Sequence, residues 1–190
     1  NPPHMVAICF DRHLYYPLMH IDNEKQVPLK MRPLAFDAPS EVQFVRDLEA
    51  FYNSPKGKEY FTDRDLYLMR NSSHKSKGIG FALAGNFYPD FLLWIIEGEK
   101  QYLAFIDPKG LRQVDRNSPK LQLYKEIKNY EKKLDDPNLA LEAFVLSETK
   151  FSDLLNNDLT KDELADRHIL FMDDGRDAYL PKMLGKISRL

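Results

Sequence analysis

The sequence predicts an α/β fold in which a mixed central sheet is flanked by helices, in the order helix, three strands, helix, strand. Two observations carry this prediction. Apolar residues recur with the helical period in residues 40–52 and 118–134. Between and after these segments lie short apolar runs of strand length, bounded by polar turns. With 190 residues, 43% of them hydrophobic, the chain can build one domain with a sizeable core.

The composition argues against a membrane protein. The longest uninterrupted apolar run, residues 91–96, is far too short to cross a bilayer, and the first residues lack a charged start followed by an apolar stretch. A single cysteine, Cys9, cannot form an internal disulfide, which fits a reducing, cytoplasmic setting. Because the chain does not begin with Met, we expect it to be a piece of a longer parent protein.

Residues 1–39 are expected to form an N-terminal extension, and residues 40–190 the main domain. Within the extension, loose alternation of apolar residues predicts a hairpin that turns at Asp11-Arg12. A connector punctuated by prolines follows and leads to the first helix.

The first helix is predicted from Ser40 to the neighbourhood of Asn53. Ser40 with Gln43 three residues later is typical of a capping box, which would place Ser40 at the N-cap. Its apolar stripe consists of Phe44, Val45, Leu48, Phe51 and Tyr52.

The remaining elements follow from the same two periods. A second helix is predicted over 118–134, with Ser118 as its N-cap, Pro119 in its first position and an apolar side of Leu123, Ile127, Tyr130 and Leu134. Strands are predicted at 65–71, in a hairpin at 91–96 and 101–107, and at 139–149 and 168–174. Short helices are predicted at 161–167 and around 179–187.

The hairpin carries charged residues that are unusual in buried strands. If its turn is centred between Gly98 and Glu99, Asp90 lies directly opposite Asp107, with Cβ atoms about 4.5–5.5 Å apart. Two carboxylates in this arrangement repel each other, so we expect a positive charge between them.

A hard divalent cation such as Mg²⁺ suits this position, because it prefers carboxylate oxygens and keeps some of its waters. Lys109 follows Asp107 by two residues and therefore points to the same face of the strand. An ammonium there can orient a water molecule or stabilise charge on a phosphate. The alternative is that Asp90 and Asp107 are ordinary strand-terminal residues in solvent turns.

Glu41 lies three and four residues before Phe44 and Val45, which places it on the helix stripe that faces the sheet. It is therefore a candidate to reach a metal from the helix. The alternative is an acid that simply interacts favourably with the helix dipole. Glu49, at the fringe of the same stripe, is a second, less favoured candidate.

At these residues the sequence resembles the PD-(D/E)xK nuclease superfamily. The resemblance rests on Pro89-Asp90, sixteen intervening residues, then Asp107-Pro108-Lys109, with a helical acid upstream. Stretches such as "SEVQFVRDLEAFY", "KGIGFALAGNFYPDFLLWI" and "YLAFIDPKGLR" are more closely similar to the C-terminal nuclease domain of type III restriction enzyme Res-subunit-like proteins. The similarity covers about residues 40–184.

This resemblance implies a restriction-endonuclease-like core and Mg²⁺-dependent hydrolysis of DNA phosphodiesters, with Mn²⁺ as a substitute and a role in phage defence. Asp90 and Asp107 would bind the metal, assisted by the Pro108 carbonyl and Glu41, and Lys109 would act on the attacking water. A helicase or ATPase motor in the parent protein or in trans, and a homodimer, are expected from the resemblance alone. The chain lacks a Gln-x-x-x-Tyr motif after Lys109 and contains no Walker A motif.

The charges are segregated along the chain although the net charge is only −2. Residues 109–133 contain eight basic and three acidic side chains, as expected of a segment that follows a phosphate backbone. A solvated helix face explains the same pattern. The candidates for DNA contact are Arg70, Lys75, Lys77, Arg112, Arg116 and Lys120. Trp94 is read as a core residue rather than as a platform for base stacking.

The sequence therefore predicts a metal-dependent DNA endonuclease domain. A nuclease fold that is catalytically inactive and serves as a DNA-binding or docking module is the alternative. A metal-free structural domain with an incidental hairpin is the third hypothesis.

Overall fold

A computed structural model describes residues 38–71, 87–111, 119–155 and 157–188, and the backbone of 6–7 and 19–20. Its elements are β1 (Val6–Ala7), β2 (Met19–His20), α1 (Pro39–Tyr52), α2 (Pro55–Tyr60), β3 (Asp65–Arg70), β4 (Phe91–Glu97), β5 (Lys100–Lys109), η2 (Pro119–Gln122), α3 (Leu123–Leu134), β6 (Leu139–Ser147), η3 (Phe151–Asp153), α4 (Lys161–Asp166), β7 (Ile169–Phe171), η4 (Met172–Asp174) and α5 (Arg176–Ser188).

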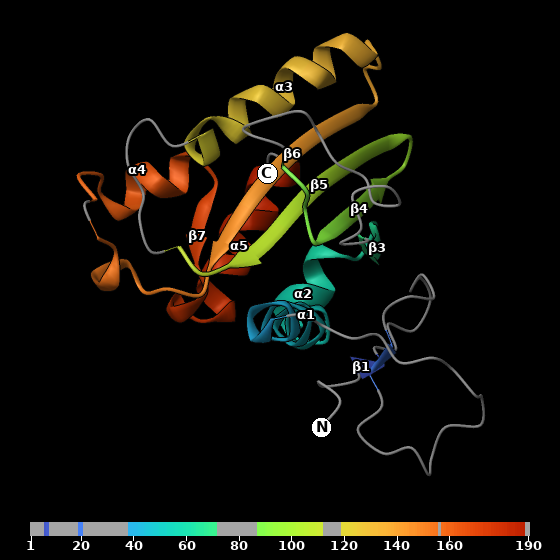
Figure 1. Cartoon of the computed structure of the whole chain (residues 1–190). Helices are drawn as coiled ribbons and strands as arrows, with labels where there is room; N and C mark the ends of the chain where they lie inside the picture. Colours follow the sequence, from blue (N-terminus) through green and yellow to red (C-terminus); the bar gives the residue numbers. More distant parts are fainter. Residues whose placement is uncertain are drawn as a thin grey trace.

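The main sheet has five strands in the order β3-β4-β5-β6-β7. Strands β3, β4 and β5 are antiparallel neighbours, whereas β5, β6 and β7 run parallel. Figure 1 shows α3 lying along β6, with α1 and α2 at the other side of the sheet near β3 and β4. The predicted mixed sheet flanked by helices is therefore confirmed.

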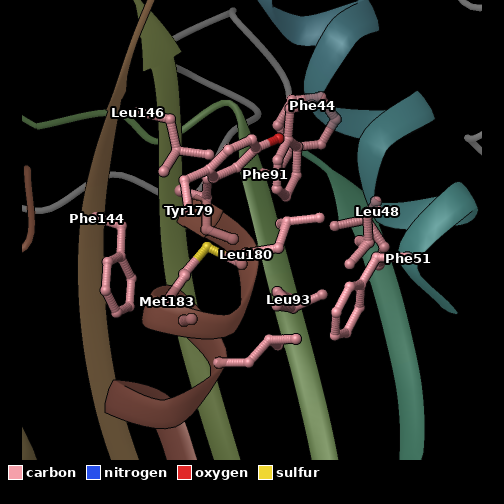
Figure 2. Close-up of a cluster of buried hydrophobic side chains, with 14 of the residues drawn as sticks. Phe44, Leu48, Phe51, Phe91, Leu93, Phe144, Leu146, Tyr179, Leu180 and Met183 are labelled. Atoms are coloured by element: carbon pink, nitrogen blue, oxygen red, sulfur yellow. The ribbon is translucent and has the colours of Figure 1, made fainter. Parts of the chain in front are cut away.

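One face of the sheet carries the larger core, which we call the α1 face. Side chains of α1 and α5 pack there against alternate residues of the strands, among them Phe91 and Leu93 of β4 and Phe144 of β6 (Figure 2). The ring of Phe44 lies 5.2 Å from that of Phe91. The predicted apolar stripe of α1 is confirmed, because Phe44, Val45, Leu48 and Phe51 are all buried and Tyr52 packs against them.

The opposite face, which we call the α3 face, holds a second cluster. Leu123 and Ile127 of α3 and Leu164 of α4 cover Phe105 and Val145, which alternate with the strand residues of the α1 face. The helix predicted over 118–134 begins as the 3-10 helix η2 at Pro119 and becomes α-helical only at Leu123. The predicted cap Ser118 lies outside the described residues.

The predicted capping box of α1 is wrong. Ala38 is the N-cap residue, Pro39 occupies the first turn, and no side chain caps the helix. Proline lacks an N–H and is pre-organised for the first helical position, so the helix begins one residue earlier than expected. The Ser40 hydroxyl instead donates a hydrogen bond outside the helix, and Gln43 donates to Asp47.

Helix α2 was not predicted from the sequence, although Ser54 caps it and Pro55 starts it in the usual way. Its Gly57 packs so closely on the end of α1 that a Cβ atom there would lie 1.9 Å from the Phe51 carbonyl oxygen. Only glycine permits this approach between the two helices.

Two apolar side chains are more exposed than predicted. Leu134 is the last residue of α3 and is 58% exposed. Trp94 lies outside both cores and lines an apolar hollow of about 480 Å³ on the sheet, together with Tyr67, Met69 and Ile96. Among the described residues, α3 contributes Leu123 and Ile127 to the cluster of the α3 face, which includes Leu92 of β4 but not Trp94.

In the predicted extension, β1 and β2 pair antiparallel, with Val6 opposite His20 and Ala7 opposite Met19. The proposed turn at Asp11-Arg12, Cys9 and the connector lie outside the described residues. Within the described parts of the chain, no helix has both the length and the hydropathy required to span a membrane.

Candidate functional site

The hairpin formed by β4 and β5 has the register expected from the sequence. Gly98 and Glu99 form its two-residue turn, and Glu97 pairs with Lys100. Gly98 has a φ of 60°, a value that the first central residue of a type II′ turn requires and that glycine adopts without strain. The ladder ends at the pair Phe91 and Ile106. The next residue on each side is an aspartate, Asp90 just before β4 and Asp107 within β5, so the same register extended by one pair would set the two opposite each other.

Asp107 and Lys109 lie at the carboxyl end of β5, a central strand of the sheet. Since Phe105 belongs to the α3 face, the alternation of the strand points Asp107 and Lys109 to that face as well. The Lys109 ammonium forms an ion pair with Oδ2 of Asp107. The carboxylate is buried, with the residue only 3% exposed.

The environment of Lys109 lowers the pKa of its side chain. Burial of the ammonium, assisted by the positive charge of Lys120, lowers the pKa of Lys109 to about 8, against the opposing influence of Asp90. The interactions with Lys120 and Asp90 place these two side chains within electrostatic range of Lys109. The hairpin and the segment that leads into α3 therefore converge at this end of the sheet.

Glu41 lies in the first turn of α1 and is 4% exposed. The helix presents it to the sheet, but on the α1 face. Its Oε2 atom accepts a hydrogen bond of 2.6 Å from Nη2 of Arg70, at the end of β3. Arg70 shares the α1 face with Leu66 and Leu68 because β3 alternates in the same way. Glu41 is thus the counter-ion of Arg70, and the acids of the hairpin point to the other face.

Glu49 lies two turns further along α1 and is half-buried. Its carbonyl oxygen accepts a hydrogen bond from the Asn53 side chain, which helps to end the helix. Neither Glu41 nor Glu49 joins Asp90 and Asp107 in a common group: among the described residues, no three His, Cys, Asp or Glu side chains converge as a metal site.

Two carboxylates, Asp90 and Asp107, are the donor type that a divalent cation such as Mg²⁺ takes. Buried Oδ2 of Asp107 accepts no hydrogen bond from a neutral donor in the described part of the chain, and its neighbour is the ammonium of Lys109. The Lys109 ammonium already supplies one positive charge to this oxygen, and a divalent cation would be a second. Mg²⁺ is commonly held by one or two carboxylates, with waters and substrate phosphates completing its shell, so a third acid is not required.

Two buried polar residues that the sequence did not assign to this site, Ser40 and Asn71, hold its backbone. Ser40 Oγ donates a hydrogen bond of 3.1 Å to the Pro108 carbonyl oxygen, which was the predicted accessory metal ligand. Asn71 donates twice, from its backbone N–H to the Asp90 carbonyl at 2.7 Å and from Nδ2 to the Pro89 carbonyl at 2.9 Å. In the sequence, these two residues stand out only as a serine next to Pro39 and an asparagine at the end of a strand pattern.

Of the predicted DNA contacts, the structure describes Arg70 and Lys120. The side chain of Arg70 is 11% exposed and points to α1, where Glu41 engages it. Lys120 lies in η2 on the same side as Lys109. The other four candidates, Lys75, Lys77, Arg112 and Arg116, lie outside the described residues.

The site therefore contains the Asp107–Lys109 ion pair, with Asp90 and Lys120 within electrostatic range of Lys109. A separate buried ion pair, Glu41 with Arg70, lies on the opposite face. No protein-family model, no curated protein and no solved structure matches this chain.

Proposed function

We propose that this chain is a metal-dependent DNA endonuclease domain with a restriction-endonuclease-like core, acting within a restriction or helicase-nuclease protein. The observation that supports the proposal is the end of the hairpin, where the ladder stops at Phe91 and Ile106 and an aspartate follows on each side, Asp90 and Asp107, with Lys109 paired to Asp107. Facing carboxylates with an adjacent ammonium at the end of a rigid sheet suit the hydrolysis of a phosphodiester.

In this proposal Asp90 and Asp107 hold the divalent cation, Mg²⁺ or Mn²⁺. When bound, the cation would act as a Lewis acid and neutralise negative charge on the phosphate. Lys109 positions the attacking water beside the phosphorus and stabilises the negative charge that accumulates on the phosphate oxygens. Lys120 extends the positive surface next to Lys109 and contacts the DNA backbone. The helicase motor and a second copy for the second strand remain part of the proposed setting.

A nuclease fold that binds DNA without cutting it is the second candidate. It is favoured by the engagement of Glu41 with Arg70, which leaves two acids rather than three at the hairpin. The buried Asp107 argues against it, because two neighbouring carboxylates repel each other and a single lysine offsets only one of their two negative charges.

Nicking of supercoiled plasmid tests the proposal. We expect relaxation with Mg²⁺ or Mn²⁺, none with EDTA, and a loss of at least about 100-fold in Asp107→Asn and Lys109→Met, since each removes a charged group that acts on the reacting phosphate. Asp173→Asn and Lys182→Met change exposed residues of η4 and α5 and serve as matched controls.

Two outcomes would remove the proposal. The first is an absence of nicking with every metal, both for the chain alone and with an ATP-driven partner supplied. The second is nicking that survives Asp107→Asn, because it would place the chemistry elsewhere. DNA binding without nicking would instead support the second candidate.

A further inference from the structure

Four residues, which form two neighbouring pairs in the sequence, connect α1 and β3 to the two strand ends of the candidate site. They are Ser40 and Glu41 at the start of α1, and Arg70 and Asn71 at the end of β3. We call them the clamp. All four are enclosed: Ser40, Glu41 and Asn71 are 2%, 4% and 7% exposed, and the Arg70 side chain is 11% exposed.

The outer members of the clamp hold the backbone on either side of the site. Ser40 donates to the carbonyl of Pro108, the residue between Asp107 and Lys109. Asn71 donates to the carbonyls of Pro89 and Asp90. The β4 and β5 ladder stops at Phe91 and Ile106, so these carbonyls lie beyond it and need other partners.

The inner members of the clamp, Glu41 and Arg70, connect the outer ones. Glu41 and Arg70 form a buried ion pair whose atoms are 2.6 Å apart, and each is covalently adjacent to one of the residues that hold the strands. The pair therefore ties the first turn of α1 to the end of β3. Helix α1 packs on the α1 face, whereas Asp107 and Lys109 point to the α3 face. Through the clamp, α1 nevertheless contacts the backbone that carries these two residues.

We infer that Ser40 and Asn71 are positioning residues, and that the Glu41–Arg70 ion pair braces them, so that the clamp sets the separation of Asp90 from Asp107 and Lys109. The inference rests on the proposed function for its catalytic consequence, but its geometric content stands on the hydrogen bonds. A misplacement of about 1 Å between reacting groups costs on the order of 100-fold in rate. Losing one of the hydrogen bonds made by Ser40 or Asn71 could therefore lower the rate even if the backbone moves by only about 1 Å.

Hydrogen–deuterium exchange followed by mass spectrometry tests the geometric part on the whole chain. In Ser40→Ala we expect exchange in a peptide covering residues 105–111 to accelerate by about tenfold, and in Asn71→Ala the same for a peptide covering 87–92, since one hydrogen bond to each segment is lost. Ser40→Thr, which keeps the hydroxyl, should restore slow exchange. Ser188→Ala is the matched control, because Ser188 is also a buried serine that donates to a carbonyl, that of Leu184 in α5.

Plasmid nicking tests the catalytic part. Both alanine variants should lower kcat by about 10- to 100-fold and leave KM for DNA within about twofold, because Ser40 and Asn71 do not touch DNA in this arrangement. The control Ser188→Ala should keep both constants.

The two readouts separate the two claims. A wild-type chain that never cleaves, with local exchange faster in both variants, would remove the proposed function and leave the positioning role standing. Exchange unchanged in both variants would overturn the positioning role, whatever the nicking assay gives. Exchange that rises equally along the whole chain, as in a general loss of stability, would overturn it as well.

Discussion

The ion pair between Glu41 and Arg70 gives Glu41 a different role from the metal ligand expected from the sequence. From the sequence, Glu41 was a candidate metal ligand, because it lies on the side of the helix that faces the sheet. The structure bears out that orientation but gives the carboxylate a guanidinium partner at 2.6 Å. Asp107 and Lys109 alternate to the other face of β5, so the helix acid and the hairpin acids are separated by the sheet itself.

A double-mutant cycle on this pair gives a stability prediction. Arg70→Met removes the guanidinium that pairs with the buried Glu41 carboxylate, so we expect a loss of about 3–5 kcal/mol in the free energy of unfolding. Adding Glu41→Leu removes the buried negative charge as well, and the double variant should recover most of that loss. Urea unfolding measures both changes. Strictly additive losses would mean that the two side chains do not compensate each other.

At the scale of elements, the open edge of β6 is sealed by side chains. Strand β7 pairs with β6 only through Val145, Leu146 and Ser147, so the earlier part of β6 has no strand on that side among the described residues. Glu131 of α3 accepts a hydrogen bond of 2.6 Å from the Leu141 N–H. His168, just before β7, hydrogen bonds through Nδ1 to the Ala143 carbonyl at 3.2 Å. Covered edges of this kind prevent pairing with other chains.

A buried charge lies on the same edge. Glu142 of β6 is 3% exposed and pairs with Lys128 of α3 at 2.7 Å, while His168 stacks on Phe144 with ring centroids 4.6 Å apart. In the sequence, Glu142 stands out as an acid within the apolar pattern of 139–147. The sequence does not show that Lys128 is its partner, because the two residues meet only in the folded chain.

His168 makes stability depend on pH. Burial, with the positive charges of Lys186 and Lys128, lowers its pKa from 6.5 to about 4, although the Ala143 carbonyl and Asp166 oppose the shift. The groups that face it are Lys128 and Tyr124 of α3, Glu142 of β6, Asp166 of α4 and Lys186 of α5.

Since the unfolded chain takes up this proton near pH 6.5 and the folded chain only near pH 4, folding stability should fall as the pH drops through this window. The contribution of His168 is up to about 3 kcal/mol. We expect His168→Asn to flatten this part of the stability curve, because asparagine tolerates the φ of 61° but does not titrate. Urea unfolding between pH 7 and pH 4 measures it, and an identical slope in the variant would refute the assignment.

At the scale of the whole molecule, local patterns predicted most of the architecture. The helical stripe of α1, the strands of the sheet and the hairpin register were visible because each depends on residues near one another in the sequence. Strand alternation was sufficient to place Asp107 and Lys109 on one face. Gly98 at the turn then determined which residue of β4 faces each residue of β5.

The rest depended on distant contacts. Ser40 resembles an N-cap in the sequence, and only the position of β5 shows that its hydroxyl reaches Pro108. The partnership of Glu41 with Arg70 required knowing that β3 lies next to the start of α1. Trp94 was read as core because apolar runs do not show where the covering helices end. Helix α2 was missed because six residues are too few to show a helical period.

The central claim is that Asp90 and Asp107 together hold a divalent cation. Titration with Mn²⁺, followed by the electron paramagnetic resonance signal of the free ion, measures this without requiring cleavage. We expect one bound Mn²⁺ per chain, an affinity loss of at least about tenfold in Asp90→Asn and in Asp107→Asn, and wild-type binding in Glu41→Gln and in the control Asp173→Asn. Wild-type binding in Asp107→Asn, or an absence of binding by the unmodified chain at millimolar Mn²⁺, would contradict it.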